Sequence, residues 1–182
     1  MIADDMDSPG LALIGSHGYC SQEMVNLLLF GSAVSNTFDG DVTLGSAPAD
    51  VTVLKGVSKR SDIGLLSLFE HYKSVTVGER LKSPSFPVWV VCSESHFTVI
   101  WDGSTFQDQV SSGTSRGRRR RLFYYDQLGR QEQVIQLTVI EDNGGCDVTA
   151  RQATVLESPL NHCIRTKWPH SEIVWENCEP LL

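Results

Sequence analysis

The chain has 182 residues, of which 41% are hydrophobic and 20% charged, and its formal net charge is −7 at pH 7. This length and composition are typical of one soluble globular domain with a substantial core, and the negative charge disfavours non-specific binding to nucleic acid. No stretch approaches the ~20 consecutive apolar residues of a membrane-spanning helix, and the acidic start at residues 1–7 does not resemble a signal peptide.

The first predicted element is a short helix over residues 21–31, preceded by a loop over residues 1–19. Ser21 can cap the start of this helix, and Gly31 can adopt the left-handed conformation that ends it. Its apolar side chains form a broad face that we expect to be buried. These side chains are Met24, Leu27, Leu28 and Phe30.

Cys20 stands immediately before this helix, where the partial positive charge of the helix start favours a thiolate. From the residues alone, Cys20 is therefore a candidate nucleophile for a thiol hydrolase. The more common explanation is a loop cysteine that packs beside the helix.

Between this helix and the middle of the chain, the sequence predicts a loop over residues 36–50 and a brief strand over residues 51–54. A second helix is predicted over residues 61–72, with Ser61 as its cap. Its apolar face comprises Leu65, Leu68, Phe69 and Tyr72. Residues 77–84 should form a non-helical connection, because prolines stand at its end and just beyond.

A hairpin is predicted in the middle of the chain, where two runs rich in Val, Ile and aromatic residues flank the polar residues 92–95. His96 begins the second strand, so its imidazole would be held on rigid backbone at the end of a sheet. Cysteine hydrolases need a base, because a nearby His converts a thiol into the more nucleophilic thiolate. His96 is thus the candidate base, and Cys20 would be its partner. A single His in a strand more commonly has a structural or surface role.

After the hairpin, residues 103–121 predict a loop, residues 122–126 and 133–139 predict strands, and residues 158–165 begin a helix with serine and proline at its start. Asp126 closes the first of these strands. Papain-like enzymes orient their imidazole from such a position. An Asp that starts a turn is the more common explanation.

Arg118–Arg121 form the one basic cluster of the sequence. Such a cluster could contact RNA, an acidic partner or a nuclear import receptor. We interpret it as a solvated loop, because no aromatic residues interleave to stack on bases.

The cysteines are odd in number and lack a CxxC pair, which is typical of reduced thiols in cytosol or nucleus. A disulfide framework or a zinc site is not indicated. The five are Cys20, Cys92, Cys146, Cys163 and Cys178.

Four long stretches resemble the catalytic domain of the MINDY deubiquitinases. They read GYCSQEMVNLLLFGSAVSN (18–36), RSDIGLLSLFEHY (60–72), VWVVCSESHFTVIW (88–101) and CIRTKWPHSEIVWENCEPLL (163–182). The resemblance implies that residues 1–182 are the C-terminal portion of that domain. The fold class expected is α+β, distantly related to papain-like cysteine peptidases, with an antiparallel sheet around the hairpin and helices packed on it. Family members usually have YYDGL where this chain has Gln127 in place of the glycine.

By this resemblance His96 is the general base of a cysteine peptidase. The family nucleophile is a different cysteine, upstream of the region that resembles this chain, and a Gln before it helps to form the oxyanion hole. The resemblance therefore does not support Cys20 as nucleophile. We expect the sequence to be a fragment or truncated gene model, or else a pseudoenzyme, and these alternatives stay open.

The resemblance implies a deubiquitinase that cleaves polyubiquitin, linked through ubiquitin's lysine forty-eight, at the isopeptide bond. This mechanism needs no cofactor or metal, and the implied partner is polyubiquitin, without membrane or nucleic acid. The alternative is a catalytically inactive remnant that binds ubiquitin or another protein. A contact with RNA or an import receptor through Arg118–Arg121 is the third hypothesis.

Overall fold

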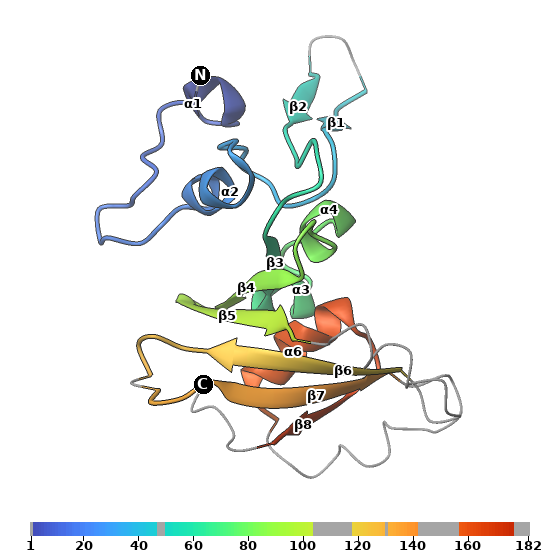
Figure 1. Ribbon diagram of the computed structural model, residues 1–182. Coiled ribbons are helices and arrows are strands. Elements are labelled where there is room, and N and C mark those ends of the chain that lie inside the picture. The colour runs from blue at the N-terminus through green and yellow to red at the C-terminus, as the bar shows by residue number, and fades with distance from the viewer. Residues whose placement is uncertain (1, 47–49, 104–117, 130, 142–156, 177–182) are drawn as a thin grey trace. The chain divides into compact units, whose positions relative to one another are not determined.

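The computed structural model describes residues 2–46, 50–103, 118–129, 131–141 and 157–176, and it divides into two compact units (Figure 1). The first unit comprises Met1–Leu65 and Lys73–Pro87, and the second comprises Leu66–Tyr72 and Val88–Leu182. The candidate base therefore lies in the second unit and Cys20 in the first.

The first unit contains short helices and one small hairpin in its described residues. They are α1 (Ile2–Asp5), α2 (Gln22–Phe30), β1 (Val42–Leu44), β2 (Thr52–Leu54) and α4 (Glu79–Lys82). The strands β1 and β2 pair antiparallel to each other. The loops expected over residues 1–19 and 36–50, and the non-helical connection over residues 77–84, are thus wrong in part, because α1, β1 and α4 lie there. Elements of three or four residues are too short to show a periodicity in the sequence.

Helix α4 illustrates why such elements are hard to predict. Its N-cap residue, Gly78, has no side chain to cap the helix. The carboxylate of Asp39 does so instead, because it accepts hydrogen bonds from the backbone N–H groups of Glu79 (2.9 Å) and Arg80 (3.0 Å). A cap supplied from about forty residues away leaves no local signal.

Helix α2 confirms the predicted caps, and it confirms the predicted apolar face in part, because Phe30 is buried and Met24 and Leu27 are half-buried. The Ser21 hydroxyl accepts a hydrogen bond from the Met24 N–H at 3.3 Å, and Gly31 is left-handed with φ of 79°. Leu28, however, is 72% exposed. The buried side of the helix carries Glu23, Asn26, Leu29 and Phe30. Polar Asn26 is buried because its amide donates to the backbone oxygens of residues 34 and 36, which holds the chain that follows the helix.

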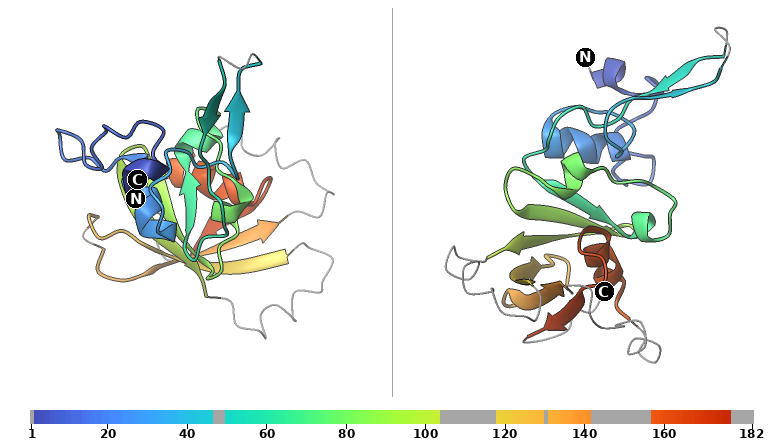
Figure 2. Two further views of the ribbon diagram at one scale, coloured as in Figure 1. Left: turned by 90° about the horizontal axis from the view of Figure 1, so that it is seen from above. Right: turned by 90° about the vertical axis from the view of Figure 1, so that its right-hand side faces the viewer.

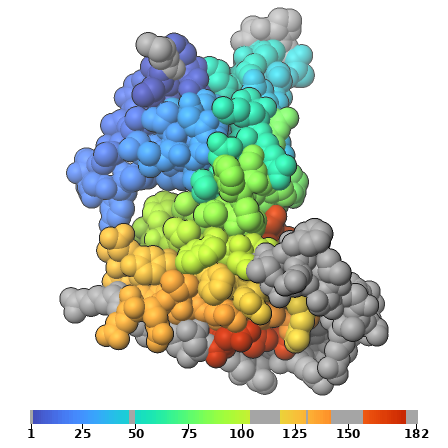
Figure 3. Space-filling model, viewed as in Figure 1, coloured from blue at the N-terminus to red at the C-terminus, as the bar shows by residue number. Residues whose placement is uncertain are grey.

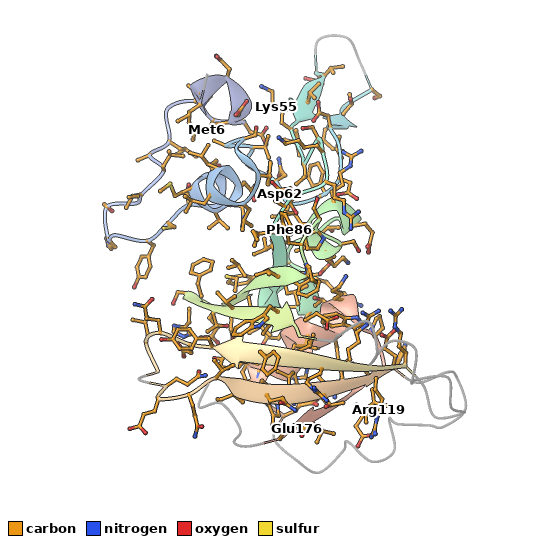
Figure 4. All side chains as sticks on the ribbon, in the orientation of Figure 1. Met6, Lys55, Asp62, Phe86, Arg119 and Glu176 are labelled. Carbon is orange, nitrogen blue, oxygen red and sulfur yellow. The ribbon has the colours of Figure 1, made fainter. Side chains whose placement is uncertain are left out.

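The acidic start of the chain is anchored within the first unit, where Figure 4 labels Met6 and Lys55. The Asp5 carboxylate accepts hydrogen bonds from the Ser32 hydroxyl (2.9 Å) and the Ala33 N–H (3.1 Å). The Asp7 carboxylate accepts a hydrogen bond from the backbone N–H of Lys55 at 3.0 Å. Met6, which stands between Asp5 and Asp7 in the chain, is buried. Charge-assisted hydrogen bonds therefore hold a segment that the sequence indicated as loop.

In its described residues, the second unit has a six-stranded sheet and two helices. In spatial order the strands are β3 (Gly64–Ser67), β4 (Val88–Ser93), β5 (His96–Asp102), β6 (Arg118–Tyr125), β7 (Ile135–Glu141) and β8 (Glu172–Trp175), and the helices are α3 (Leu68–His71) and α6 (Pro159–Lys167). The first two residues of β3 belong to the first unit. From β4 to β8 every neighbouring pair is antiparallel. This mixture of an antiparallel sheet with packed helices confirms the α+β class.

The core of the second unit lies between the sheet and α6, which Figure 2 shows on one side of the strands. Alternate side chains of β4 to β7 meet the apolar side of the helix, as the two-residue period of a strand requires. This cluster includes Trp89, Val91, Ile100, Leu122, Tyr124, Leu137 and Val139 on the sheet, and Leu160, Cys163, Ile164 and Trp168 on or next to α6. Burying each such side chain contributes about 1.5–3 kcal/mol. On the opposite face, the side chains of β6 and β7 lie at the surface (Figure 3).

The helix predicted over residues 61–72 is wrong over residues 61–67 and is confirmed only for its last turn. Residues 64–67 form strand β3, and only α3 follows as a single helical turn. Ser67 caps this turn by accepting from the Phe69 N–H at 3.2 Å, whereas the Ser61 hydroxyl donates to the backbone oxygen of Arg80. All four residues of β3 are buried. A short apolar run buried on both faces has no period that separates strand from helix.

The basic cluster is also corrected, because Arg118–Arg121 belong to strand β6 rather than to a loop. Arg120 lies between the carboxylates of two neighbouring strands, at 2.6 Å from Glu141 and 3.5 Å from Asp102. These partners explain how Arg120 is accommodated in the sheet. Of the predicted 103–121 loop, residues 104–117 lie outside the described part of the structure.

Within the described residues, no helix is both long and apolar enough to cross a membrane.

Candidate functional site

The predicted hairpin is confirmed, and it fixes His96 at the start of β5. Ser93 pairs with His96 across a two-residue turn, Glu94 and Ser95. Glu94 has a positive φ of 58°, which tight hairpin turns require at this position. The Cys92 thiol donates to the Glu94 carbonyl at 3.4 Å. The turn therefore comprises two of the four polar residues 92–95, because Cys92 and Ser93 belong to β4.

The imidazole of His96 meets the carboxylate of Asp126 at the end of the sheet. Its Nε2 atom lies 2.9 Å from Oδ2 of Asp126, and their side chains are only 18% and 8% exposed. Ile100 pairs with Tyr124 in the β5–β6 ladder. Alternation along the strands therefore puts His96 and Asp126 on the same face of the sheet, toward α6.

The contact determines which ring nitrogen can act as a base. An ionised carboxylate only accepts hydrogen bonds, so Nε2 carries the proton that is shared with Asp126. The other nitrogen, Nδ1, is then the one available to a reacting group when the ring is neutral. The Asp126 carboxylate is therefore in direct contact with His96, which the orienting role suggested by the sequence requires.

The turn after β6 holds the Asp126 carboxylate from its other side. Oδ1 accepts a hydrogen bond from the Leu128 N–H at 2.9 Å. Gly129 approaches so closely that a Cβ atom there would be 2.9 Å from Oδ2. Burial by itself raises the pKa of Asp126, but hydrogen bonds from His96 and from the N–H groups of Gly129 and Leu128 outweigh it and hold the pKa below 3.8. The carboxylate is therefore ionised at neutral pH.

Tyr124 lies two residues before Asp126 on the same face and is only 1% exposed. Burial, and next the charge of the Asp126 carboxylate, raise the pKa of Tyr124 to about 12. Its phenol therefore stays neutral and adds no second base to the site.

Three cysteines lie in the described residues, and all three are free thiols. Burial raises the pKa of Cys92. Burial also raises the pKa of Cys163 to about 12, with a smaller contribution from Cys92. Neither thiol is a thiolate at neutral pH. Cys20 is exposed, before α2, but it belongs to the first unit and is not brought together with His96 in one unit.

No group of three His, Cys, Asp or Glu side chains in the described ranges could hold a metal ion. His71 and His162 do come together, with ring centroids 4.1 Å apart and an interplanar angle of 18°. Stacked rings cannot aim their nitrogen lone pairs at one ion, because those lone pairs lie in the ring planes.

Comparison with known proteins identifies the chain's relatives. Residues 1–177 match the family described as "Deubiquitinating enzyme MINDY-3/4, conserved domain". The chain belongs to the MINDY-3/4 family. Over all 182 residues it is 46% identical to the "Probable ubiquitin carboxyl-terminal hydrolase MINDY-4" of Xenopus tropicalis and 48% identical to that of Bos taurus. Over 98 residues, 54% of the chain, it is 40% identical to "Ubiquitin carboxyl-terminal hydrolase MINDY-3" of Xenopus tropicalis, of which this stretch covers 21%.

The chain spans about a quarter of the length of its MINDY-4 relatives, 24% of the Xenopus tropicalis protein and 23% of the Bos taurus protein. No solved structure matches it significantly. The MINDY resemblance of the sequence is therefore confirmed at the level of family. The relationship to papain-like peptidases stays a prediction.

Sequence reasoning missed two residues of the candidate site in this MINDY-3/4 family member, Gly129 and Gln131. Gly129 makes room for the Asp126 carboxylate, and the Gln131 side chain accepts a hydrogen bond from the backbone N–H of Asp126. Both follow a strand in a polar turn, where glycine and glutamine are ordinary. Their roles become visible only in the folded turn, where they lie close to Asp126.

Proposed function

We propose that this chain supplies the general base of a cysteine peptidase that cleaves polyubiquitin at the isopeptide bond. His96 is the base, and Asp126 orients its ring. The observation that carries this proposal is the 2.9 Å contact between Nε2 and Oδ2 at the end of the sheet. Membership of a family of deubiquitinating enzymes supports the substrate class.

In this mechanism Nδ1 of His96 accepts the proton of a cysteine thiol, and the thiolate attacks the carbonyl carbon of the isopeptide bond. The tetrahedral intermediate collapses, and the imidazolium gives its proton to the departing lysine amine. A thioester to the ubiquitin C-terminus remains. Water then attacks the thioester while His96 accepts its proton, and the imidazolium returns a proton to the sulfur. The carboxylate of Asp126 stabilises the imidazolium in both halves of the cycle.

The nucleophile comes from outside the described part of the second unit, because burial raises the pKa of both described cysteines there and so disfavours formation of a thiolate. Resemblance to the family favours an upstream cysteine, and Cys20 is the alternative.

We also propose a papain-like arrangement, in which Nε2 faces the orienting residue and Nδ1 faces the sulfur. Cleavage of chains linked through lysine forty-eight and residence in a reducing compartment, cytosol or nucleus, belong to the same proposal. The three free thiols support that compartment.

The test uses a chimaera in which this chain replaces the matching segment of the Xenopus tropicalis MINDY-4 relative. The chimaera and the unmodified relative are reacted with ubiquitin that carries a C-terminal electrophile, and cleavage of polyubiquitin of defined linkages is measured. We expect a covalent adduct and cleavage, with cleavage lost in His96→Gln. If the unmodified relative forms the adduct and the chimaera does not, this chain is a non-catalytic ubiquitin-binding segment instead.

The same reagent decides the identity of the nucleophile. We expect the 182-residue chain alone to form no adduct. An adduct that disappears in Cys20→Ala would show that Cys20 is the nucleophile and that the chain is self-sufficient.

A further inference from the structure

One side chain ties together the turn that carries the Asp126 carboxylate. Oε1 of Gln131 accepts a hydrogen bond from the backbone N–H of Asp126 at 2.9 Å. Its Nε2 atom donates to the backbone oxygen of Tyr124 at 3.0 Å and to that of Gln133 at 2.7 Å. Gln131 therefore connects the last residues of β6 to the chain that leads into β7.

The partners settle the orientation of this amide. A backbone N–H can only donate, so it must face Oε1, and two backbone oxygens can only accept, so they must face the NH₂ group. All three bonds together need an acceptor and two donors on one planar group at the end of two methylenes. Glutamine meets this requirement. Glutamate has the length but lacks the donors, and asparagine has the amide but is one methylene shorter.

The backbone held by Gln131 is the backbone from which the Asp126 side chain projects. Its carboxylate has little freedom of its own, because Leu128 bonds one oxygen and His96 the other. Residue 129 leaves room for Oδ2 only because it is glycine, since a Cβ atom there would lie 2.9 Å from that oxygen. A shift of the Asp126 backbone would therefore lengthen the bond to His96 rather than be absorbed by a rotation of the carboxylate.

We propose that Gln131 is a positioning residue for the His96–Asp126 pair, acting through the backbone of Asp126. The inference rests on the proposed function for its catalytic meaning, although the positioning itself can be measured without any activity. Gln131 touches neither the imidazole nor a reacting atom in this scheme. Its effect is to keep Oδ2 aimed at Nε2, so that the ring presents Nδ1.

The first experiment uses nuclear magnetic resonance on the 182-residue chain. Gln131→Met keeps the length of the side chain and removes all three hydrogen bonds. The matched control is Gln127→Met, because Gln127 is an exposed glutamine of the same turn. The ¹⁵N shifts of the His96 ring report its tautomer, and the ¹³Cγ shift of Asp126 reports the ionisation of its carboxyl group.

In the unmodified chain and in Gln127→Met, we expect neutral His96 to populate a single tautomer with the proton on Nε2. In Gln131→Met we expect a mixture of both tautomers and a rise of the Asp126 pKa toward 3.8. Amide resonances of β4 and β7 confirm that the fold is kept. If Gln131→Met does not fold, Gln131→Glu gives the same readouts. An unchanged tautomer and an unchanged Asp126 pKa in a folded variant would overturn the proposal.

The second experiment measures steady-state cleavage of polyubiquitin in the active chimaera. We expect Gln131→Met to lower kcat on the order of ten-fold, with KM unchanged, because only the alignment of the base is affected. Gln127→Met should match the unmodified chimaera. A rise in KM alone would contradict a role in positioning the base. An inactive chimaera would defeat the proposed function but leave the resonance test of Gln131 intact.

Discussion

His96 and Asp126 are thirty residues apart in the chain, yet Nε2 of the first lies 2.9 Å from Oδ2 of the second. They meet because β5 and β6 are antiparallel neighbours, so the start of one strand lies near the end of the other. Both side chains are largely withdrawn from solvent. An imidazole held by a buried carboxylate at the end of a rigid sheet has the geometry of a general base and its orienting residue.

Removal of the Asp126 carboxylate should slow cleavage of polyubiquitin without unfolding the protein. In the chimaera, Asp126→Ala is expected to lower kcat for polyubiquitin cleavage by roughly 100-fold, within the range that general acid–base catalysis supplies. Asp126→Asn should be less severe, because its amide oxygen can still accept from Nε2. Steady-state kinetics check the order of the two variants. Equal activity of Asp126→Ala and the unmodified protein would exclude an orienting role.

The lowered pKa of Asp126 predicts how stability depends on pH. Because the folded value is below the ordinary 3.8, the carboxylate contributes stability that is fully present above pH 3.8 and is lost as pH falls through the folded value. Urea unfolding of the wild type and of Asp126→Asn at several pH values between about 2 and 7 checks this. We expect a constant difference in the free energy of unfolding above pH 3.8 that narrows below it. A difference that already closes well above pH 3.8 would contradict the lowered pKa.

Gly129→Ala should disturb the site through steric contact alone. The added Cβ would lie 2.9 Å from Oδ2 and 3.2 Å from Cγ of Asp126, closer than carbon tolerates, so the carboxylate must move. We expect kcat in the chimaera to fall about ten-fold and the contact with His96 to weaken. Gln127→Ala, in the same turn, should leave kcat unchanged. Full activity of Gly129→Ala would show that the turn can yield without loss of the pair.

Stability of the second unit should depend on the face of the sheet that meets α6. Leu137 is fully buried in that core, so Leu137→Ala should lower the free energy of unfolding by about 2–5 kcal/mol through lost burial and a cavity. Leu128 is 78% exposed, and Leu128→Ala should change the free energy of unfolding by no more than about 0.5 kcal/mol. Urea denaturation of both variants measures the contrast. Similar losses would mean that the burial described for Leu137 is not the source of the stability.

The sequence could predict the elements that carry a local signal. Ser21 and Gly31 mark the ends of α2, and the two apolar runs around residues 92–95 mark the hairpin that begins β5 with His96. The position of the candidate base was therefore evident from local pattern together with the family resemblance. The prediction for Gly64–Ser67 was wrong because a fully buried short run has no period. The prediction for Arg118–Arg121 was wrong because the partners of Arg120, Asp102 and Glu141, lie on other strands.

The sequence by itself determined the family of this protein, its α+β class and the placement of one imidazole at the start of a strand. Only the tertiary structure decided that Asp126 holds this imidazole, that Leu128, Gly129 and Gln131 hold Asp126, and that burial keeps Cys163 protonated. The reason is physical. Caps and turns depend on residues a few positions apart, which a sequence displays directly, whereas strand register and burial depend on contacts between residues that only folding brings together.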